Sequence, residues 1–151
     1  MLICCAAFPP IVTLNSENNL CKRFNFSTHE GQISIEIDKI MFIKGSGSYS
    51  QIHIEDEVQS ICISQNLGFF QKNLKTENFL RCHKSWLVNV FKISSWYHKK
   101  KLLYISNFGI PVSRRKWRKV CSILSNKGIK PAKMLSLGIT NLRPEIKYDD
   151  L

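Results

Sequence analysis

The sequence predicts a mostly-β fold with two short helices, on the basis of three observations. Apolar and polar residues alternate with a period of two in several short segments, which is the pattern of half-buried strands. Breaks rich in Gly, Ser and Asn separate these segments and predict turns. Two other segments space their apolar residues at helical intervals. A length of 151 residues is typical of one domain with additional residues at its ends.

Four strands are expected in the first half of the chain, after an irregular arm over residues 1–31. The clearest signal comes from Ile33, Ile35 and Ile37, which alternate with polar residues. An acidic turn, 55–57, separates the last two strands, so we expect these two to form a hairpin. The expected strands cover residues 32–37, 40–44, 50–54 and 58–63.

Both helices and the remaining strands are expected after residue 63. Ser64 can cap a helix that continues to Leu74, because its apolar residues recur at i, i+3 and i+7. Ser113 can cap a second helix over residues 114–124. The strands expected between these helices cover residues 79–82, 86–90, 93–97, 102–105 and 110–112. Residues 127–151 show no clear period and are expected to form a tail.

Positive charge is concentrated in one block of the sequence. No Asp or Glu occurs between Asn78 and Pro144, and these 67 residues carry 15 of the 22 Lys and Arg residues. The formal net charge of the chain is +11. So many basic residues have few acidic partners within the chain, which predicts that they bind an external polyanion. Nucleic acid is the commonest such polyanion, and phosphate attraction dominates affinity in its complexes.

The start of the second expected helix is the first candidate for phosphate contact. Arg114, Arg115 and Lys116 follow Ser113 there. Cations at this end oppose the helix dipole, whereas a bound anion would satisfy both the cations and the backbone N–H groups. The alternative is a solvated basic face without a ligand.

Three further segments carry residues that could contact nucleic acid. The segment 81–85 joins two strands and offers Arg, His, Lys and Ser side chains to phosphates and bases. The segment 45–49, Gly-Ser-Gly-Ser-Tyr, lacks the full nucleotide-binding patterns and is expected to be a flexible loop that approaches a duplex. The hairpin turn expected at 98–101 is a nonspecific electrostatic contributor or simply a soluble turn.

The sequence offers no motif for catalysis, for a metal or for a cofactor, so we expect no enzyme. It contains no G-x-S-x-G, H-E-x-x-H or nucleotide-loop motif, and no C-x-x-C spacing among its six cysteines. Cys82 lies beside Arg81 and His83, which could lower its thiol pKa, so a redox role stays open beside a structural one. No apolar run approaches the ~17 residues that cross a bilayer. We therefore expect a cytoplasmic protein with no membrane partner.

Three stretches, in this order, resemble the LytTR-type DNA-binding domain of bacterial transcription regulators. They are Ile37–Ile54, Phe79–Ile93 and Ile110–Trp117. The middle stretch contains F-L-R-C-H-K-S-W-L-V-N, which is similar to the family pattern F-x-R-x-H-R-S-[YF]-[ILV]-V-N. The resemblance covers about residues 35–124 and implies a compact LytTR-like arrangement of short antiparallel sheets. We expect the DNA-binding domain to occupy residues 32–126.

The resemblance also implies how such a domain would work. It implies a sequence-specific regulator of transcription whose loops, rather than a recognition helix, enter the major groove of short direct repeats in double-stranded DNA. The expected DNA-binding residues are Ser48, Tyr49, His83, Lys84, Ser85, Arg114, Arg115 and Lys116. Lys84 stands where the family pattern has Arg, so it keeps the charge but loses bidentate geometry.

Protein partners follow from the same resemblance. Many family members carry an N-terminal receiver domain, for which the residues before Gln32 are too few. The chain is therefore expected to be either a stand-alone regulator or a DNA-binding part separated from its sensor. The candidate protein partners are a separate sensor protein and a second copy of the chain on an adjacent repeat.

An RNA-binding module is the alternative function. Trp86, Trp96, Tyr97 and Tyr104 lie among the basic residues, and aromatic rings on a sheet can stack on unpaired bases. If the same rings instead form the core of the domain, this alternative loses its main support.

Overall fold

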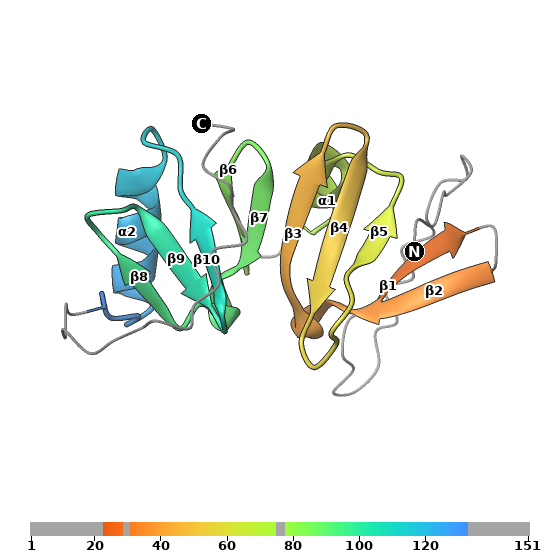
Figure 1. Cartoon of the computed structure of the whole chain (residues 1–151), viewed down its shortest axis with the longest axis horizontal. Helices are drawn as coiled ribbons and strands as arrows, with labels where there is room; N and C mark the ends of the chain where they lie inside the picture. The colour runs from red at the N-terminus through yellow and green to blue at the C-terminus, as the bar shows by residue number, and fades with distance from the viewer. Residues whose placement is uncertain (1–22, 29–30, 75–77, 133–151) are drawn as a thin grey trace. The chain divides into compact units, whose positions relative to one another are not determined.

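The structure is a computed structural model that describes residues 23–28, 31–74 and 78–132 (Figure 1). The chain divides into two compact units. Unit 1 contains the described residues up to Arg81 together with Ser85–Asn89, and unit 2 contains Cys82–Lys84 and the described residues from Val90 onward. The chain is mostly β-strand with two helices, as the sequence predicts.

Unit 1 is built on a five-stranded sheet with the order β5-β4-β3-β7-β6. Its central strand, β3, pairs antiparallel with β4 and β7, so that Ile43 lies opposite both Ile52 and Leu87. All three side chains are buried, as the period-2 pattern requires for one face of a sheet. The strands are β3 (Ile40–Ser46), β4 (Tyr49–Ile54), β5 (Ile61–Ile63), β6 (Phe79–His83) and β7 (Trp86–Asn89), and the last residues of β6 belong to unit 2.

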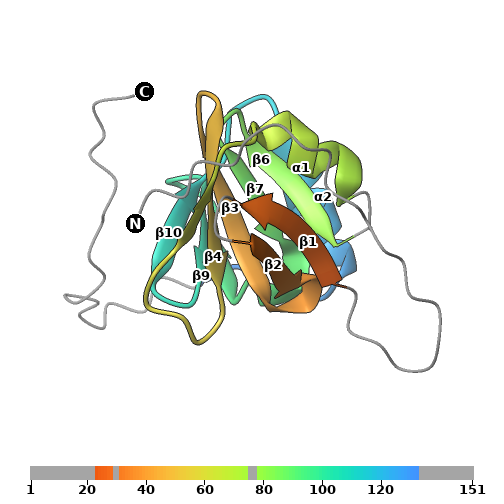
Figure 2. The ribbon, with the colours of Figure 1, turned by 90° about the vertical axis from the view of Figure 1, so that its right-hand side faces the viewer.

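A helix and a hairpin complete the hydrophobic core of unit 1. Helix α1 (Leu67–Asn73) contributes Phe70, whose ring centroid lies 6.1 Å from that of Phe24. Phe24 belongs to the hairpin of β1 (Arg23–Thr28) and β2 (Gly31–Glu36), which faces the viewer in Figure 2. A short 3-10 helix, Ile37–Lys39, leads from this hairpin into β3. Full burial of each such apolar side chain stabilises the fold by about 1.5–3 kcal/mol.

The strand β1 corrects the expectation of an irregular arm over residues 1–31. Residues 23–28 form a strand in register with β2, in which Phe24 faces Ile35. Phe24 and Phe26 alternate with polar residues and are buried. The pattern has only two apolar positions, which is too short a signal to stand out from the residues around it. Residues 1–22 lie outside the described part of the chain.

Unit 2 combines a three-stranded antiparallel sheet, in the order β10-β9-β8, with helix α2. The apolar face of α2 carries Trp117, Val120 and Leu124 at i, i+3 and i+7, and all three are buried. Trp117 packs against Trp96 of β8 with ring centroids 5.7 Å apart. The elements are a 3-10 turn (Val90–Lys92), β8 (Ser95–Tyr97), β9 (Leu102–Ile105), β10 (Phe108–Pro111) and α2 (Trp117–Asn126).

Both helices begin later than the sequence predicts. Helix α1 is capped by Asn66, whose Oδ1 accepts a hydrogen bond from the Phe69 N–H at 2.9 Å, and not by Ser64. Helix α2 has Lys116 at its N-cap without a side-chain capping bond. Ser113 contributes its backbone carbonyl, which accepts from the N–H of Lys116 at 3.1 Å. A serine that lies three or four positions before the first apolar residue of a helix, as Ser64 and Ser113 do, is thus easily mistaken for the N-cap.

Several strand and tail boundaries also differ from expectation. The fourth expected strand, 58–63, is reduced to β5, because the chain bends at residues 58 and 59 after the turn at Asp56. The described start of the expected 127–151 tail packs along β8, where the Ala132 N–H donates to the carbonyl of Trp96 at 2.8 Å. Residues 133–151 of that tail lie outside the described residues.

Candidate nucleic-acid interface

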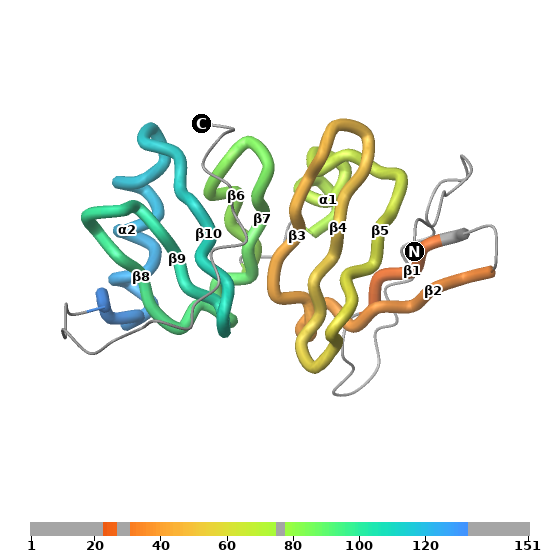
Figure 3. The backbone as a smooth tube through the Cα atoms, viewed as in Figure 1, coloured from red at the N-terminus to blue at the C-terminus, as the bar shows by residue number. Residues whose placement is uncertain are grey.

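The β3–β4 hairpin presents Ser48 and Tyr49 at its end. Ser46 pairs with Tyr49, so the connection consists of Gly47 and Ser48 (Figure 3). Gly47 has φ +61°, a conformation that L side chains rarely adopt, and two-residue hairpins favour glycine for this reason. The flexible loop expected over 45–49 is therefore a tight turn. Tyr49 is 41% exposed, so its ring is available to a partner.

Ser85 lies beside this hairpin within unit 1. Its carbonyl accepts a hydrogen bond from the Gly45 N–H at 2.8 Å. The next residue, Trp86, pairs with Lys44, whose Nζ lies 5.5 Å from the indole centroid. Backbone pairing therefore holds Ser85 near the turn that carries Ser48, and the structure brings these predicted residues together.

A second group of predicted residues comes together in unit 2. The Ser113 N–H donates to the carbonyl of Cys82 at 3.0 Å, which ties the residues before α2 to the end of β6. His83 and Lys84 follow Cys82, and Arg114, Arg115 and Lys116 follow Ser113. The structure thus places two cationic segments side by side that lie thirty positions apart in the sequence.

The electrostatics of His83 reflect this concentration of positive charge. Partial burial lowers the pKa of its imidazole below the usual value, and the nearby charges of Lys84 and Lys116 lower it further. The neutral ring can both donate and accept a hydrogen bond, whereas an anion placed beside it would favour the protonated form. His83 therefore suits either a base edge or a phosphate.

The start of α2 carries bases without any balancing acid. Its first turn contains no acidic residue, and no Asp or Glu occurs in residues 78–132. Arg114, Arg115 and Arg118 are exposed, and Lys116 is half-buried. A helix N-terminus surrounded by cations attracts an anion through both its charges and its backbone N–H groups.

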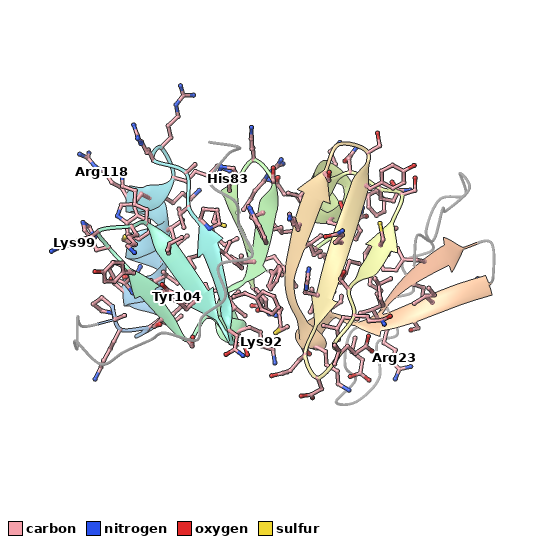
Figure 4. The ribbon with its side chains drawn as sticks, in the orientation of Figure 1. Arg23, His83, Lys92, Lys99, Tyr104 and Arg118 are labelled. Atoms are coloured by element: carbon pink, nitrogen blue, oxygen red, sulfur yellow. The ribbon has the colours of Figure 1, made fainter. Side chains whose placement is uncertain are left out.

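Arg118, one of the basic residues that follow Ser113 in the sequence, adds an exposed charge at the same end of α2. Figure 4 shows Arg118 and His83 projecting at the same end of unit 2.

The structure argues against a redox role for Cys82. Burial raises the pKa of its thiol to about 12, and the smaller effect of Lys116 does not offset this. The Sγ atom lies 3.8 Å from the carbonyl oxygen of Pro111 inside unit 2. The basic neighbours in the sequence did not predict this environment, because alternation along β6 turns Cys82 inward. A thiol with this pKa contains almost no reactive thiolate at neutral pH.

Two of the four aromatic residues that suggested RNA binding are part of the core. Trp86 and Trp96 are 9% and 8% exposed, respectively. Tyr97 and Tyr104 are half-buried on β8 and β9. The two largest rings are therefore unavailable for stacking on unpaired bases.

The described residues contain neither a metal-binding cluster nor a membrane-spanning helix. Within residues 23–28, 31–74 and 78–132, no three His, Cys, Asp or Glu side chains are grouped so that they could hold a metal ion. No helix in these same ranges is long and apolar enough to cross a membrane.

The sequence and the fold are similar to those of known proteins. A family model described as the LytTr DNA-binding domain matches residues 30–125. Among solved structures, the chain is similar to the LytTr DNA-binding domain of a Bacillus cereus protein described as a methyl-accepting/DNA response regulator. The two are 24% identical with a TM-score of 0.55, and the match covers 68% of this chain and 95% of that chain. No curated protein matches the sequence.

Proposed function

Because this chain belongs to the family of LytTr DNA-binding domains, which serve transcription regulators, we propose that it recognises specific sequences in double-stranded DNA. The observation that carries this proposal is the pair of cationic segments in unit 2, His83–Lys84 and Arg114–Lys116, held together by the Ser113–Cys82 hydrogen bond. No carboxylate lies in residues 78–132 to neutralise them. A phosphate backbone supplies the missing negative charge.

The cationic residues before α2 are proposed to contact phosphates. Arg114 and Arg115 are exposed, and they immediately precede backbone N–H groups at the start of α2. Contacts of this kind fix the position of a protein on the duplex and provide affinity that depends little on sequence. Lys116 adds charge at the same helix end.

The protruding turns are proposed to read base edges. The major groove is about 12 Å wide and admits a two-stranded ribbon, which is the form of the β3–β4 hairpin. Ser48 and Tyr49 stand at the end of that ribbon. The turn between β6 and β7 adds Lys84 and Ser85, and His83 precedes it.

The remaining features of the proposal concern organisation and partners. We propose a DNA-binding domain over residues 32–126 that acts on short direct repeats, without an enzymatic activity or a cofactor. A second copy would occupy the adjacent repeat, and a separate sensor protein would supply the regulating signal. Binding to DNA implies a cytoplasmic location for a bacterial regulator.

Selection from random duplex DNA tests this function directly. The full chain is mixed with random duplexes at physiological ionic strength, and bound molecules are amplified and sequenced. We expect a short motif that recurs in the same orientation. An unlabelled single-stranded RNA should compete much less well than the recovered duplex, because the large aromatic rings are buried. Absence of any enriched motif would refute sequence-specific binding.

A further inference from the structure

Two large apolar side chains are exposed without a role in the proposed DNA contacts. Among the residues that the structure describes, the exposed large hydrophobic residues are Tyr49, Val58 at 103% and Phe91 at 66%. Tyr49 belongs to the β3–β4 hairpin, which we assign to DNA. Val58 and Phe91 remain, and exposed apolar side chains with charged surroundings often mark contact surfaces.

Phe91 is the centre of a basic aromatic patch in unit 2, formed by Phe91, Lys92 and Lys127. The Nζ atom of Lys127 lies 4.2 Å from the centroid of the Phe91 ring. Lys92 follows Phe91 in the same 3-10 turn. In Figure 4, Lys92 lies at the end of unit 2 opposite to His83 and Arg118. The patch is thus remote from the DNA contacts proposed for that unit.

Val58 belongs to an acidic turn in unit 1, formed by Glu55, Asp56, Glu57 and Val58. The turn is well defined, because the Glu55 N–H donates to the carbonyl of Lys39 at 2.9 Å. It follows the last residue of β4, whereas Tyr49 is the first residue of that strand. The acidic turn therefore lies at the end of β4 that points away from the proposed DNA-reading hairpin.

The acidic turn is also the main concentration of negative charge in the described residues. Glu36 is neutralised by Arg23 and Lys39, at 3.0 Å and 3.2 Å. Residues 55–57 are three consecutive acidic residues, and no other such run occurs in residues 23–28, 31–74 and 78–132. The acidic turn carries the apolar side chain of Val58, and the basic aromatic patch carries the ring of Phe91. The two surfaces are therefore complementary in charge, and each offers an apolar group for contact.

We propose that the acidic turn of one copy docks on the basic aromatic patch of a second copy bound to the adjacent DNA repeat. Val58 packs against the Phe91 ring, and the carboxylates of Glu55–Glu57 approach Lys92 and Lys127. This inference rests on the proposed function, because the two copies meet on DNA. It adds a surface and an orientation that the DNA contacts do not specify.

The contact joins two different surfaces, which determines its symmetry. A contact between unlike surfaces is head-to-tail and repeats in one direction, whereas a twofold contact joins the same surface on both copies. A head-to-tail contact fits DNA sites repeated in the same orientation. It does not fit inverted sites of the same spacing.

A contact of this size is weak between separate molecules. One valine, one phenylalanine and a few charges fall below the area of stable interfaces. Two copies on neighbouring sites instead experience an effective concentration in the millimolar range, as for short linkers. The chain should therefore be monomeric in solution and cooperative on DNA.

The test measures binding to duplexes that carry one or two copies of the selected motif. We expect wild-type cooperativity on the order of tenfold on the direct repeat, within the usual range of coupling between sites. Glu57→Lys and Lys127→Glu should each abolish this cooperativity and leave one-site affinity unchanged. The double variant should restore cooperativity, because the reversed charges are again opposite. Val58→Ser should reduce it without affecting folding, since the side chain is fully exposed.

The controls separate this contact from the proposed function. Lys72→Glu reverses an exposed charge on α1 and should leave cooperativity unchanged. One-site binding without cooperativity, or equal cooperativity on inverted repeats, would overturn the contact alone. An equal loss of one-site and two-site binding in Lys127→Glu would make the patch a DNA contact and would also overturn it. Failure of the one-site duplex to bind would overturn the proposed function itself.

Discussion

The backbone N–H of Ser113 donates a hydrogen bond to the carbonyl of Cys82 at 3.0 Å. Through this bond, the residues that lead into α2 are fixed to the end of β6. His83 and Arg114 are the next residues on the two sides of the bond, so this backbone contact holds the two cationic segments side by side. Binding groups held by backbone structure lose little entropy when a ligand arrives.

Replacing one base in either cationic segment should weaken DNA binding. Lys84→Ala is expected to cost about 1–3 kcal/mol, because its turn is proposed to read base edges. Arg115→Ala should weaken binding about equally on all sequences, as a phosphate contact does. Fluorescence anisotropy with the selected duplex measures the change. Lys72→Ala is the matched control, because it removes an exposed base from α1. Unchanged affinity in both variants would show that these residues are not at the interface.

Lys84→Arg should sharpen sequence discrimination. An arginine can form two parallel hydrogen bonds with a guanine edge, whereas lysine acts as a point charge. The ratio of affinities for the selected duplex and for single-base variants should therefore increase at one position. Ser85→Ala serves as a comparison at the same turn. If Lys84→Arg raises affinity equally for all sequences, Lys84 contacts phosphate and not a base.

Binding should become tighter at acidic pH through His83. The pKa of its imidazole is lowered in the unbound protein by burial, Lys84 and Lys116. A phosphate beside the ring favours imidazolium and raises this pKa in the complex. The bound state then holds more protons, so the added affinity is complete below the unbound pKa and is lost as pH rises through the pKa of the complex.

A pH series of binding constants checks this prediction. His83→Gln should remove the part of the pH dependence that lies near and below the usual imidazole pKa of 6.5. His98→Gln, in the β8–β9 turn, is the control and should retain it. An unaltered pH profile in His83→Gln would mean that the ring does not meet an anion.

Cys82 should resist alkylation in the folded protein. Its buried thiol has a pKa of about 12, so iodoacetamide at pH 8 finds almost no thiolate. Cys121 is half-buried on α2 and should react sooner. Mass spectrometry of peptides after timed labelling gives both rates, and labelling in denaturant should make them similar. Rapid modification of Cys82 in the folded state would contradict the burial that we describe.

Local patterns in the sequence were sufficient to predict most of the fold. Apolar and polar residues alternate around Ile35 and Ile52, and this alternation indicates that one face of each strand is buried. The pattern can be recognised from residues that are neighbours in the sequence. The two helices were likewise visible from their apolar spacing. The strand β1 was missed, because Phe24 and Phe26 alone are too few to indicate a strand, and their pairing with β2 is visible only in the structure.

The candidate site was predictable only in part, because it depends on contacts that are distant in sequence. Basic composition identified His83, Lys84 and Arg114–Lys116, but the hydrogen bond that unites them joins residues 82 and 113. The basic neighbours of Cys82 left its role open, because the pKa of its thiol depends on which face of β6 it occupies. The turn at Gly47 appeared flexible from composition, whereas strand pairing makes it tight.

The salt dependence of binding to the selected duplex tests the central claim most directly. If about six phosphates are engaged, the logarithm of the association constant should fall with the logarithm of salt concentration at a slope near −5. Arg114→Ala should reduce that slope by about one and leave the preferred sequence unchanged. At physiological ionic strength the selected duplex should still bind more tightly than a scrambled one. A slope of zero, or equal affinity for both duplexes, would contradict the assignment of the cationic turns to DNA.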